Sequence, residues 1–202
     1  MTMYTIGLTG GIGTGKSEVL SILRDLGAST VEADLLAHEI YSPGKPAWQD
    51  IIDTFGSGIL TAEHQINRKK LGEIVFADRN KLSKLNQIVH PRIFDHLKEL
   101  IEEQKLAGTM VLVFEAAVLI EAKWTEMVDS VWVVQASKGI IIKRLKEKTT
   151  LTEEQITQRI NAQISDAQRQ EKANEILTNN GDKSDLRDQV RKLIIANNLN
   201  QE

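Results

Sequence analysis

The chain has 202 residues, of which 41% are hydrophobic and 26% are charged, and its formal net charge is −3. This size fits one α/β domain with modest insertions. The 25 basic and 28 acidic residues form no dense basic block, which argues against nucleic acid as the main partner. The lack of cysteine excludes disulfides, zinc–thiolate sites and a thiol nucleophile.

The beginning of the chain lacks the basic and apolar regions of a secretory signal. The apolar runs Met110–Phe114 and Ile140–Ile142 are far shorter than the roughly 18 residues that a membrane span needs. We therefore expect no membrane partner and a cytoplasmic or organelle-matrix location.

A strand, a glycine-rich turn and a helix are predicted at the start of the chain. Tyr4–Leu8 is an apolar, β-prone run, and the apolar residues from Val19 to Leu26 recur at helical spacing before Gly27. Between them, the sequence fits the phosphate-loop pattern G-x-x-x-x-G-K-[ST]. The residues of this loop are Gly10, Gly11, Ile12, Gly13, Thr14, Gly15, Lys16 and Ser17.

The chemistry of such a loop requires these residue types. The glycines let backbone N–H groups turn toward phosphate oxygens, and the N-terminus of the following helix favours negative charge. Lys16 is expected to reach the β- and γ-phosphates, and the Ser17 hydroxyl to bind Mg²⁺. The sequence therefore predicts binding of ATP or a similar nucleotide, although the loop alone does not distinguish a kinase from a GTPase or a motor ATPase.

Further strands and helices alternate along the chain. Strands are predicted at Ser29–Val31, Met110–Phe114, Ser130–Val134 and Ile176-Leu177; helices are predicted at Leu35–Tyr41, Lys138–Lys148, Thr152–Lys172 and Asp185–Ile195. Residues 48–106 show a helical pattern, with breaks near Gly56–Gly58 and at His90-Pro91. The alternation predicts a parallel sheet with helices on both faces, and the middle section and the segment after Lys148 are interpreted as insertions.

Two carboxylates follow predicted strands, where open α/β sheets bind their ligands. Asp34 is a candidate general base for an acceptor hydroxyl, and the alternative is an N-cap for the next helix. Glu115 is a candidate Mg²⁺ ligand, and the alternative is a solvated strand end. The four histidines show no metal-ligand spacing.

Basic residues gather in the segment Lys143–Lys148, and Arg159 follows in the next helical stretch. Cations in such a segment can stabilise the charge of a transferring phosphate. The alternative is the solvated face of an ordinary basic helix.

The ordered set of motifs resembles the dephospho-CoA kinase family over almost the whole chain. The matching motifs are the loop with Leu8-Thr9, Glu32-Ala33-Asp34, Pro43-Gly44, Phe55-Gly56, Asn67-Arg68 with Leu71-Gly72, Val75-Phe76, His90-Pro91, Leu119 with Glu121, Lys143-Arg144-Leu145, Arg159-Ile160 with Gln163, and Asn179-Asn180-Gly181.

The resemblance implies a P-loop core of about five parallel strands, a helical acceptor insertion at about 43–107 and a lid at about 146–172. It implies ATP-dependent phosphorylation of the ribose 3′-hydroxyl of dephospho-CoA. Asp34 matches the family's base and Arg144 a lid arginine that meets ATP. Thr9, His90 and Leu119, with Arg159, fall at acceptor-side positions, and Asn179 and Gly181 lie near the adenine.

Three positions depart from the family pattern. Glu32 stands where Asp is usual, Glu115 opens a segment that often reads Asp-x-Pro-Leu-Leu, and Lys148 replaces a second lid arginine. Residues 116–124 are more similar to the kinase domain of eukaryotic bifunctional CoA synthases. Another small-molecule kinase, such as a nucleoside monophosphate kinase, and a nucleotide-binding regulatory pseudo-kinase stay open as alternatives, and the sequence does not give the oligomeric state.

Overall fold

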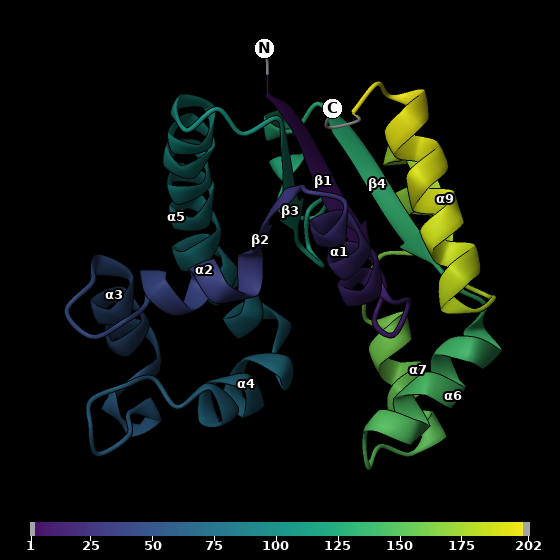
Figure 1. Ribbon diagram of the computed structural model, residues 1–202. Coiled ribbons are helices and arrows are strands. Elements are labelled where there is room, and N and C mark those ends of the chain that lie inside the picture. Colours follow the sequence, from purple (N-terminus) through teal and green to yellow (C-terminus); the bar gives the residue numbers. More distant parts are fainter. Residues whose placement is uncertain (1–2, 200–202) are drawn as a thin grey trace. The chain divides into compact units, whose positions relative to one another are not determined.

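The computed structural model describes residues 3–199, and Figure 1 shows its elements. Two compact units form: a helical unit, Ala33–Glu102, and a sheet unit built from the chain on either side of it. The strands are β1 (Tyr4–Gly10), β2 (Ser29–Glu32), β3 (Val111–Glu115), β4 (Ser130–Gln135) and β5 (Glu175–Thr178). The helices are α1 (Lys16–Asp25), α2 (Ala33–Ile40), α3 (Pro46–Phe55), α4 (Arg68–Phe76), α5 (Arg79–Leu106), α6 (Lys138–Lys148), α7 (Glu153–Asn161), α8 (Asp166–Lys172) and α9 (Lys183–Ala196), with short 3₁₀ turns η1 (Ser57–Ile59) and η2 (Trp124–Met127).

The sheet has the strand order β2-β3-β1-β4-β5, and every pairing is parallel. β1 lies at its centre, where Leu8 is in register with Glu115 of β3 and with Trp132 of β4. The predicted fold class is thereby confirmed. The central position of β1 places the loop that follows it between the carboxyl ends of two neighbouring strands.

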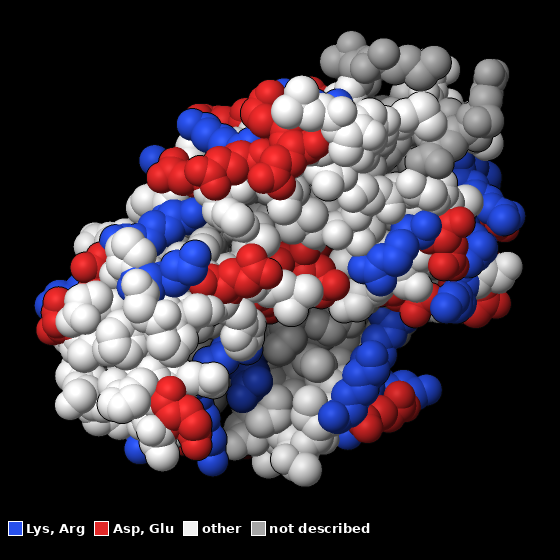
Figure 2. Space-filling view, turned by 60° about the vertical axis from the view of Figure 1, so that its left-hand side comes forward, with Lys and Arg blue, Asp and Glu red and all other residues white. Residues whose placement is uncertain are grey.

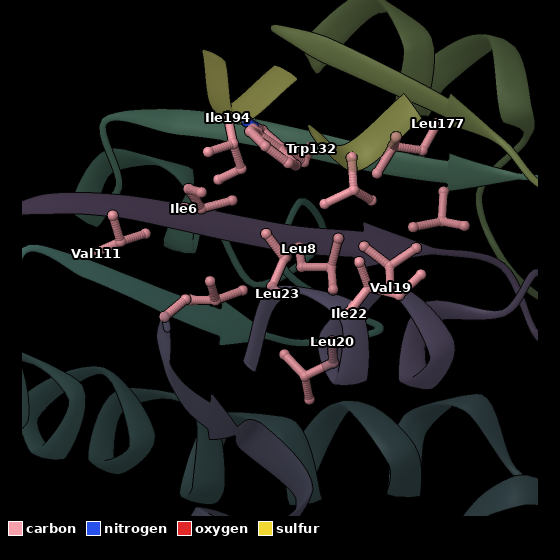
Figure 3. Packing of buried hydrophobic residues seen from close by; sticks show 14 of the residues in the cluster. Ile6, Leu8, Val19, Leu20, Ile22, Leu23, Val111, Trp132, Leu177 and Ile194 are labelled. Atoms are coloured by element: carbon pink, nitrogen blue, oxygen red, sulfur yellow. The ribbon is translucent and has the colours of Figure 1, made fainter. Parts of the chain in front are cut away.

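One face of the sheet carries the main apolar core, beneath α1 and α9. Ile6 and Leu8 of β1 point into this core with Trp132 of β4, and Figure 3 shows side chains of α1 and α9 packing on them. These side chains are fully or almost fully buried. The last two residues of the loop motif, Lys16 and Ser17, are the first residues of α1. The packing of α1 on the sheet therefore holds this end of the loop in place.

The opposite face of β1 presents Thr5, Gly7 and Thr9, because strand side chains alternate between faces. Leu119 packs above Gly7 and is completely buried. Beside it, the rings of Phe114 and Trp124 lie 5.7 Å apart between centroids. The segment after β3 thus covers the second face.

The buried apolar residues of the helical unit include Ala47, Ile51, Ile59, Leu71, Val75, Val89, Ile93 and Leu97. α4 is capped by the Asn67 side chain, which accepts the N–H of Lys70 at 3.1 Å. Asp50 of α3 pairs with Arg92 of α5.

Two of the sequence predictions are wrong. No break occurs at His90-Pro91, because α5 continues through Pro91. A proline inside a helix loses one backbone hydrogen bond, and here the buried residues Val89, Ile93 and Leu97 on one face support the helix across it. The stretch Thr152–Lys172 is two helices, since Thr152 and Ser165 each open a capping box.

Charged side chains of both signs are intermixed on the face drawn in Figure 2. Among residues 3–199, no helix combines the length and apolar character that crossing a membrane requires.

Gly7 provides a test of how tightly β1 is packed. A Cβ there would stand 2.7 Å from Leu119 Cδ2 and 3.0 Å from Val128 Cγ2. We expect Gly7→Ala to lower the free energy of unfolding by about 1–3 kcal/mol, the usual effect of overpacking. Urea denaturation followed by circular dichroism measures this.

Gly139 is the matched control, because a Cβ at this position of α6 meets nothing within 4 Å. Gly139→Ala should leave stability unchanged or raise it by up to about 1 kcal/mol, since alanine favours helix. Equal effects of the two variants would contradict this account of the packing at Gly7.

Candidate active site

The loop Gly10–Gly15 joins the carboxyl end of β1 to the N-terminus of α1. Gly15 has φ +100°, and a side chain on it would collide with the Asn179 amide. Glycine is therefore required there by both conformation and space. The α1 amides at this end lie where an anion is favoured.

Side chains hold the loop's carbonyl groups. The Thr14 hydroxyl donates to Gly11 O at 2.9 Å, and Lys16 Nζ donates to Gly10 O at 3.1 Å and to Gly11 O at 3.5 Å. Lys16 Nζ also lies 3.7 Å from Glu115 Oε1, and both side chains are about 15% exposed. Glu115 of β3 and the loop lysine thus meet at the centre of the sheet's carboxyl edge.

Arg144 and Asn179 occupy the α1 end of the loop. The amide of Asn179, 6% exposed, donates to Thr14 O at 2.8 Å. Arg144 Nη2 donates to Asn179 Oδ1 at 3.0 Å, and its Nη1 to Thr14 O at 3.5 Å. The structure therefore brings the predicted Arg144 and Asn179 together against the predicted loop.

Two further side chains, absent from the predicted site, lie at the other end of the loop. Gln163 Oε1 accepts the backbone N–H of Ile12 at 2.8 Å. Arg169 is 3% exposed and borders a hollow of about 420 Å³ together with Gly11, Ile12 and Thr14. Sequence periodicity gave no indication of Arg169, because a buried arginine within a polar stretch looks like a solvated one.

Thr9 and Leu119, the predicted acceptor-side residues of the sheet unit, are both buried. The Thr9 Oγ1 atom has no hydrogen-bond partner within residues 3–199, so a buried hydroxyl is available to a ligand at the end of β1. Leu119 packs on Gly7. Its substrate role stays a prediction.

The other predicted residues of this unit are more exposed. Ser17 lies in the first turn of α1, next to Lys16. Arg159 is exposed near the end of α7, and Gly181 is exposed in the turn before α9. No group of three or more acidic or histidine side chains in the described chain is arranged to hold a metal ion by itself.

The helical unit contains Asp34 and His90. Asp34 is exposed in the first turn of α2, which begins at Ala33, so Asp34 is not the N-cap of that helix. Burial raises the pKa of the nearby Tyr41 phenol; the positive charge of Arg68 opposes this shift, and the carboxylate of Asp34 adds to it. Burial lowers the pKa of the His90 imidazole, which favours its neutral form at neutral pH.

A polar hollow of about 320 Å³ lies in the same unit, bordered by His38, Tyr41, Gln65 and Arg68. Arg68 contacts the His38 ring directly. In the sequence, Asn67-Arg68 matched a motif of the family, but the match assigned no role to Arg68.

Comparison with known proteins decides the family. A family model described as dephospho-CoA kinase matches residues 4–185. The chain belongs to the dephospho-CoA kinase family. Its relative from Carboxydothermus hydrogenoformans, a dephospho-CoA kinase, is 40% identical over 190 residues, which cover 94% of this chain and 92% of the relative.

Solved structures agree with this membership. A Thermus thermophilus crystal structure has a TM-score of 0.82 and 25% identity, and covers 98% of both chains. The Campylobacter jejuni dephospho-CoA kinase has a TM-score of 0.70 and 27% identity, and covers 95% of both chains. The predicted family is thereby confirmed.

The two basic positions of α6 provide a ranked test. Arg144 is held against the loop, whereas Lys148 is exposed at the last residue of the helix. We expect Arg144→Ala to lower kcat/KM for ATP at least tenfold, about 1.4 kcal/mol of barrier. Lys148→Ala should have a smaller effect, and Lys148→Arg should be neutral or mildly activating, because it restores a rigid fork of donors.

Steady-state kinetics with saturating acceptor and varied ATP give this ranking. A greater loss with Lys148→Ala than with Arg144→Ala would mean that the end of α6, not Arg144, meets the nucleotide.

Proposed function

We propose that this protein transfers the γ-phosphate of ATP to the ribose 3′-hydroxyl of dephospho-CoA, giving CoA and ADP. The observation that carries the proposal is the family match across residues 4–185, within which the phosphate loop is intact. Phosphoryl transfer depends mainly on positioning and on charge stabilisation, and the loop, Lys16 and Arg144 can supply both. The proposed compartment is the cytoplasm.

Nucleotide binding changes the partners of the loop. Lys16 Nζ, now on the carbonyls of Gly10 and Gly11, exchanges them for β- and γ-phosphate oxygens. The backbone amides of the loop and of the first turn of α1 surround the phosphates, and Arg144 neutralises charge at the α1 end. Asn179 positions that arginine, and Gly181 belongs to the segment proposed beside the adenine.

Asp34 is the proposed general base. The acceptor hydroxyl attacks the γ-phosphorus, its proton passes to the Asp34 carboxylate, and the bond from the γ-phosphorus to the β–γ bridging oxygen breaks. The position of Asp34 inside α2 supports this role over the capping role, since a cap would precede Ala33. Thr9, His90, Leu119 and Arg159 are proposed for acceptor binding, of which Thr9 offers the unpaired buried hydroxyl.

Mg²⁺ is the proposed counter-ion of ATP. Mg²⁺ usually takes one or two protein oxygens in addition to phosphates and water, so the absence of a three-residue metal cluster from residues 3–199 fits it. Ser17 and Glu115 would hold the ion or its waters. When bound, it neutralises charge on the β- and γ-oxygens.

The product identifies the acceptor. Purified protein with ATP and Mg²⁺ should convert dephospho-CoA to CoA, and mass spectrometry should locate the added phosphate on the ribose. AMP, other nucleoside monophosphates and adenosine should stay unmodified. Phosphorylation of a nucleoside monophosphate with dephospho-CoA untouched would favour a nucleoside monophosphate kinase instead, and ATP binding without any product would favour a regulatory pseudo-kinase.

Asp34→Asn tests the base, because it keeps the size and polarity of the side chain. We expect kcat to fall by roughly 10²–10⁴ with little change in ATP affinity. Lys16→Ala should instead weaken the use of ATP itself. Asp53→Asn is the matched control, since Asp53 is an exposed α3 carboxylate that accepts only Gln49 within the described chain. Near-normal turnover of Asp34→Asn would exclude Asp34 as the base.

A further inference from the structure

Arg169 of α8 is a buried cation with too few partners. Its side chain is 3% exposed, and its Nη1 atom donates to Asp166 Oδ1 at 3.1 Å. The Nε and Nη2 atoms have no hydrogen-bond partner among residues 3–199. Burying a guanidinium with two unsatisfied donors is costly, and such a group is retained where a ligand completes it.

The free atoms form one edge of the guanidinium. Nε–H and Nη2–H point to the same side of the planar group, at a spacing that matches two oxygens of a phosphate or carboxylate. Asp166, which is 57% exposed, takes only the Nη1 atom at the far corner. The ion pair therefore orients the group and leaves the buried Nε and Nη2 atoms without an acceptor among residues 3–199.

This arginine lies at the phosphate loop. It borders the hollow of about 420 Å³ with Gly11, Ile12 and Thr14, and its Nη1 atom is 3.6 Å from where a Cβ on Gly11 would stand. Ile141 of α6 and Ile160 of α7 form apolar walls of the same hollow. The remaining lining is polar and includes Gln163, Ser165 and the Asp166 carboxylate that pairs with Arg169.

The position of Lys16 indicates which phosphate binds at the Gly10–Gly11 end of the loop. A loop lysine binds the β- and γ-phosphates, and Lys16 Nζ lies at the carbonyls of Gly10 and Gly11. Arg144 and Asn179 lie instead at Thr14 and Gly15, beside the start of α1. Gly11 and Arg169 are thus at the terminal-phosphate end.

The Gln163 side chain lies at the same end of the loop as Arg169. Its Oε1 atom accepts the Ile12 N–H at 2.8 Å, as a phosphate oxygen would. The carboxamide therefore acts as a stand-in for an anion next to Arg169.

We propose that the Arg169 guanidinium binds the γ-phosphate of ATP, while Arg144 serves the other end of the triphosphate. The proposal rests on the nucleotide half of the proposed function and not on the identity of the acceptor. The two arginines would then contact different parts of the nucleotide. Arg169 distinguishes ATP from ADP, and Arg144 contributes to the binding of both.

Isothermal titration calorimetry with Mg²⁺ and without acceptor tests this division. Arg169→Met should weaken ATP binding at least tenfold and change ADP binding less than about twofold. Arg169→Lys keeps the charge but loses the fork, so it should recover part of the ATP affinity. Arg144→Met should weaken both nucleotides. Lys172→Met, on an exposed residue of the same helix, is the matched control and should change neither.

Equal losses of ATP and ADP with Arg169→Met would overturn the proposal, as would an unchanged ATP affinity. ADP binding shows that each Arg169 variant is folded at the loop. If Arg169→Met does not fold, Arg169→Lys decides by whether its loss is confined to ATP. The result is separate from the acceptor assay: a chain that selects ATP through Arg169 but leaves dephospho-CoA unmodified would refute the acceptor and keep this inference.

Discussion

The phosphate loop must keep its amide groups free for an anion, and the rest of the structure is arranged around that constraint. A backbone carbonyl needs a partner when buried, and here side chains supply it: Lys16 and Thr14 for Gly10 and Gly11, and Asn179 for Thr14. Because side chains hold these carbonyls, the loop needs few hydrogen bonds of its own; the Thr14 N–H donates to Gly11 O at 3.4 Å. The Ile12 N–H is held by the Gln163 side chain, which a phosphate oxygen can replace.

The sheet topology determines which segments can supply these partners. With β1 between β3 and β4, the carboxyl ends of three strands meet at the loop. β3 ends in Glu115, which meets Lys16, and β4 leads into α6, which carries Arg144. β5, next to β4, is followed directly by Asn179. Residues more than a hundred positions apart thus reach one loop because each follows a strand of the same parallel sheet.

The strands and the phosphate loop could be predicted from the sequence, because each depends on a short, contiguous pattern of residues. Apolar runs gave the strands, and the glycine–lysine spacing gave the loop. The same reasoning placed a break at Pro91, because it gave local proline chemistry precedence over the apolar face that continues on both sides. It also missed Ser165 as a helix start, although Ser165 and Gln168 carry the capping-box pattern. Arg169 had no such pattern, and Gln163 was part of a matching family motif without a role, because both roles depend on which end of the loop the side chains reach.

Three cations lie around the loop, and of these Arg169 is buried whereas Lys16 and Arg144 are partly exposed. Lys16, Arg144 and Arg169 approach the loop at different points, and Glu115 and Asp166 offset only part of their charge. Like charges raise each other's free energy, and a triphosphate bound along the loop would relieve this at each cation. A nucleotide lacking its last phosphate would leave the Gly11 end uncompensated. Fixed cations placed before the ligand arrives also need little rearrangement during transfer, which is how preorganised charge lowers a phosphoryl-transfer barrier.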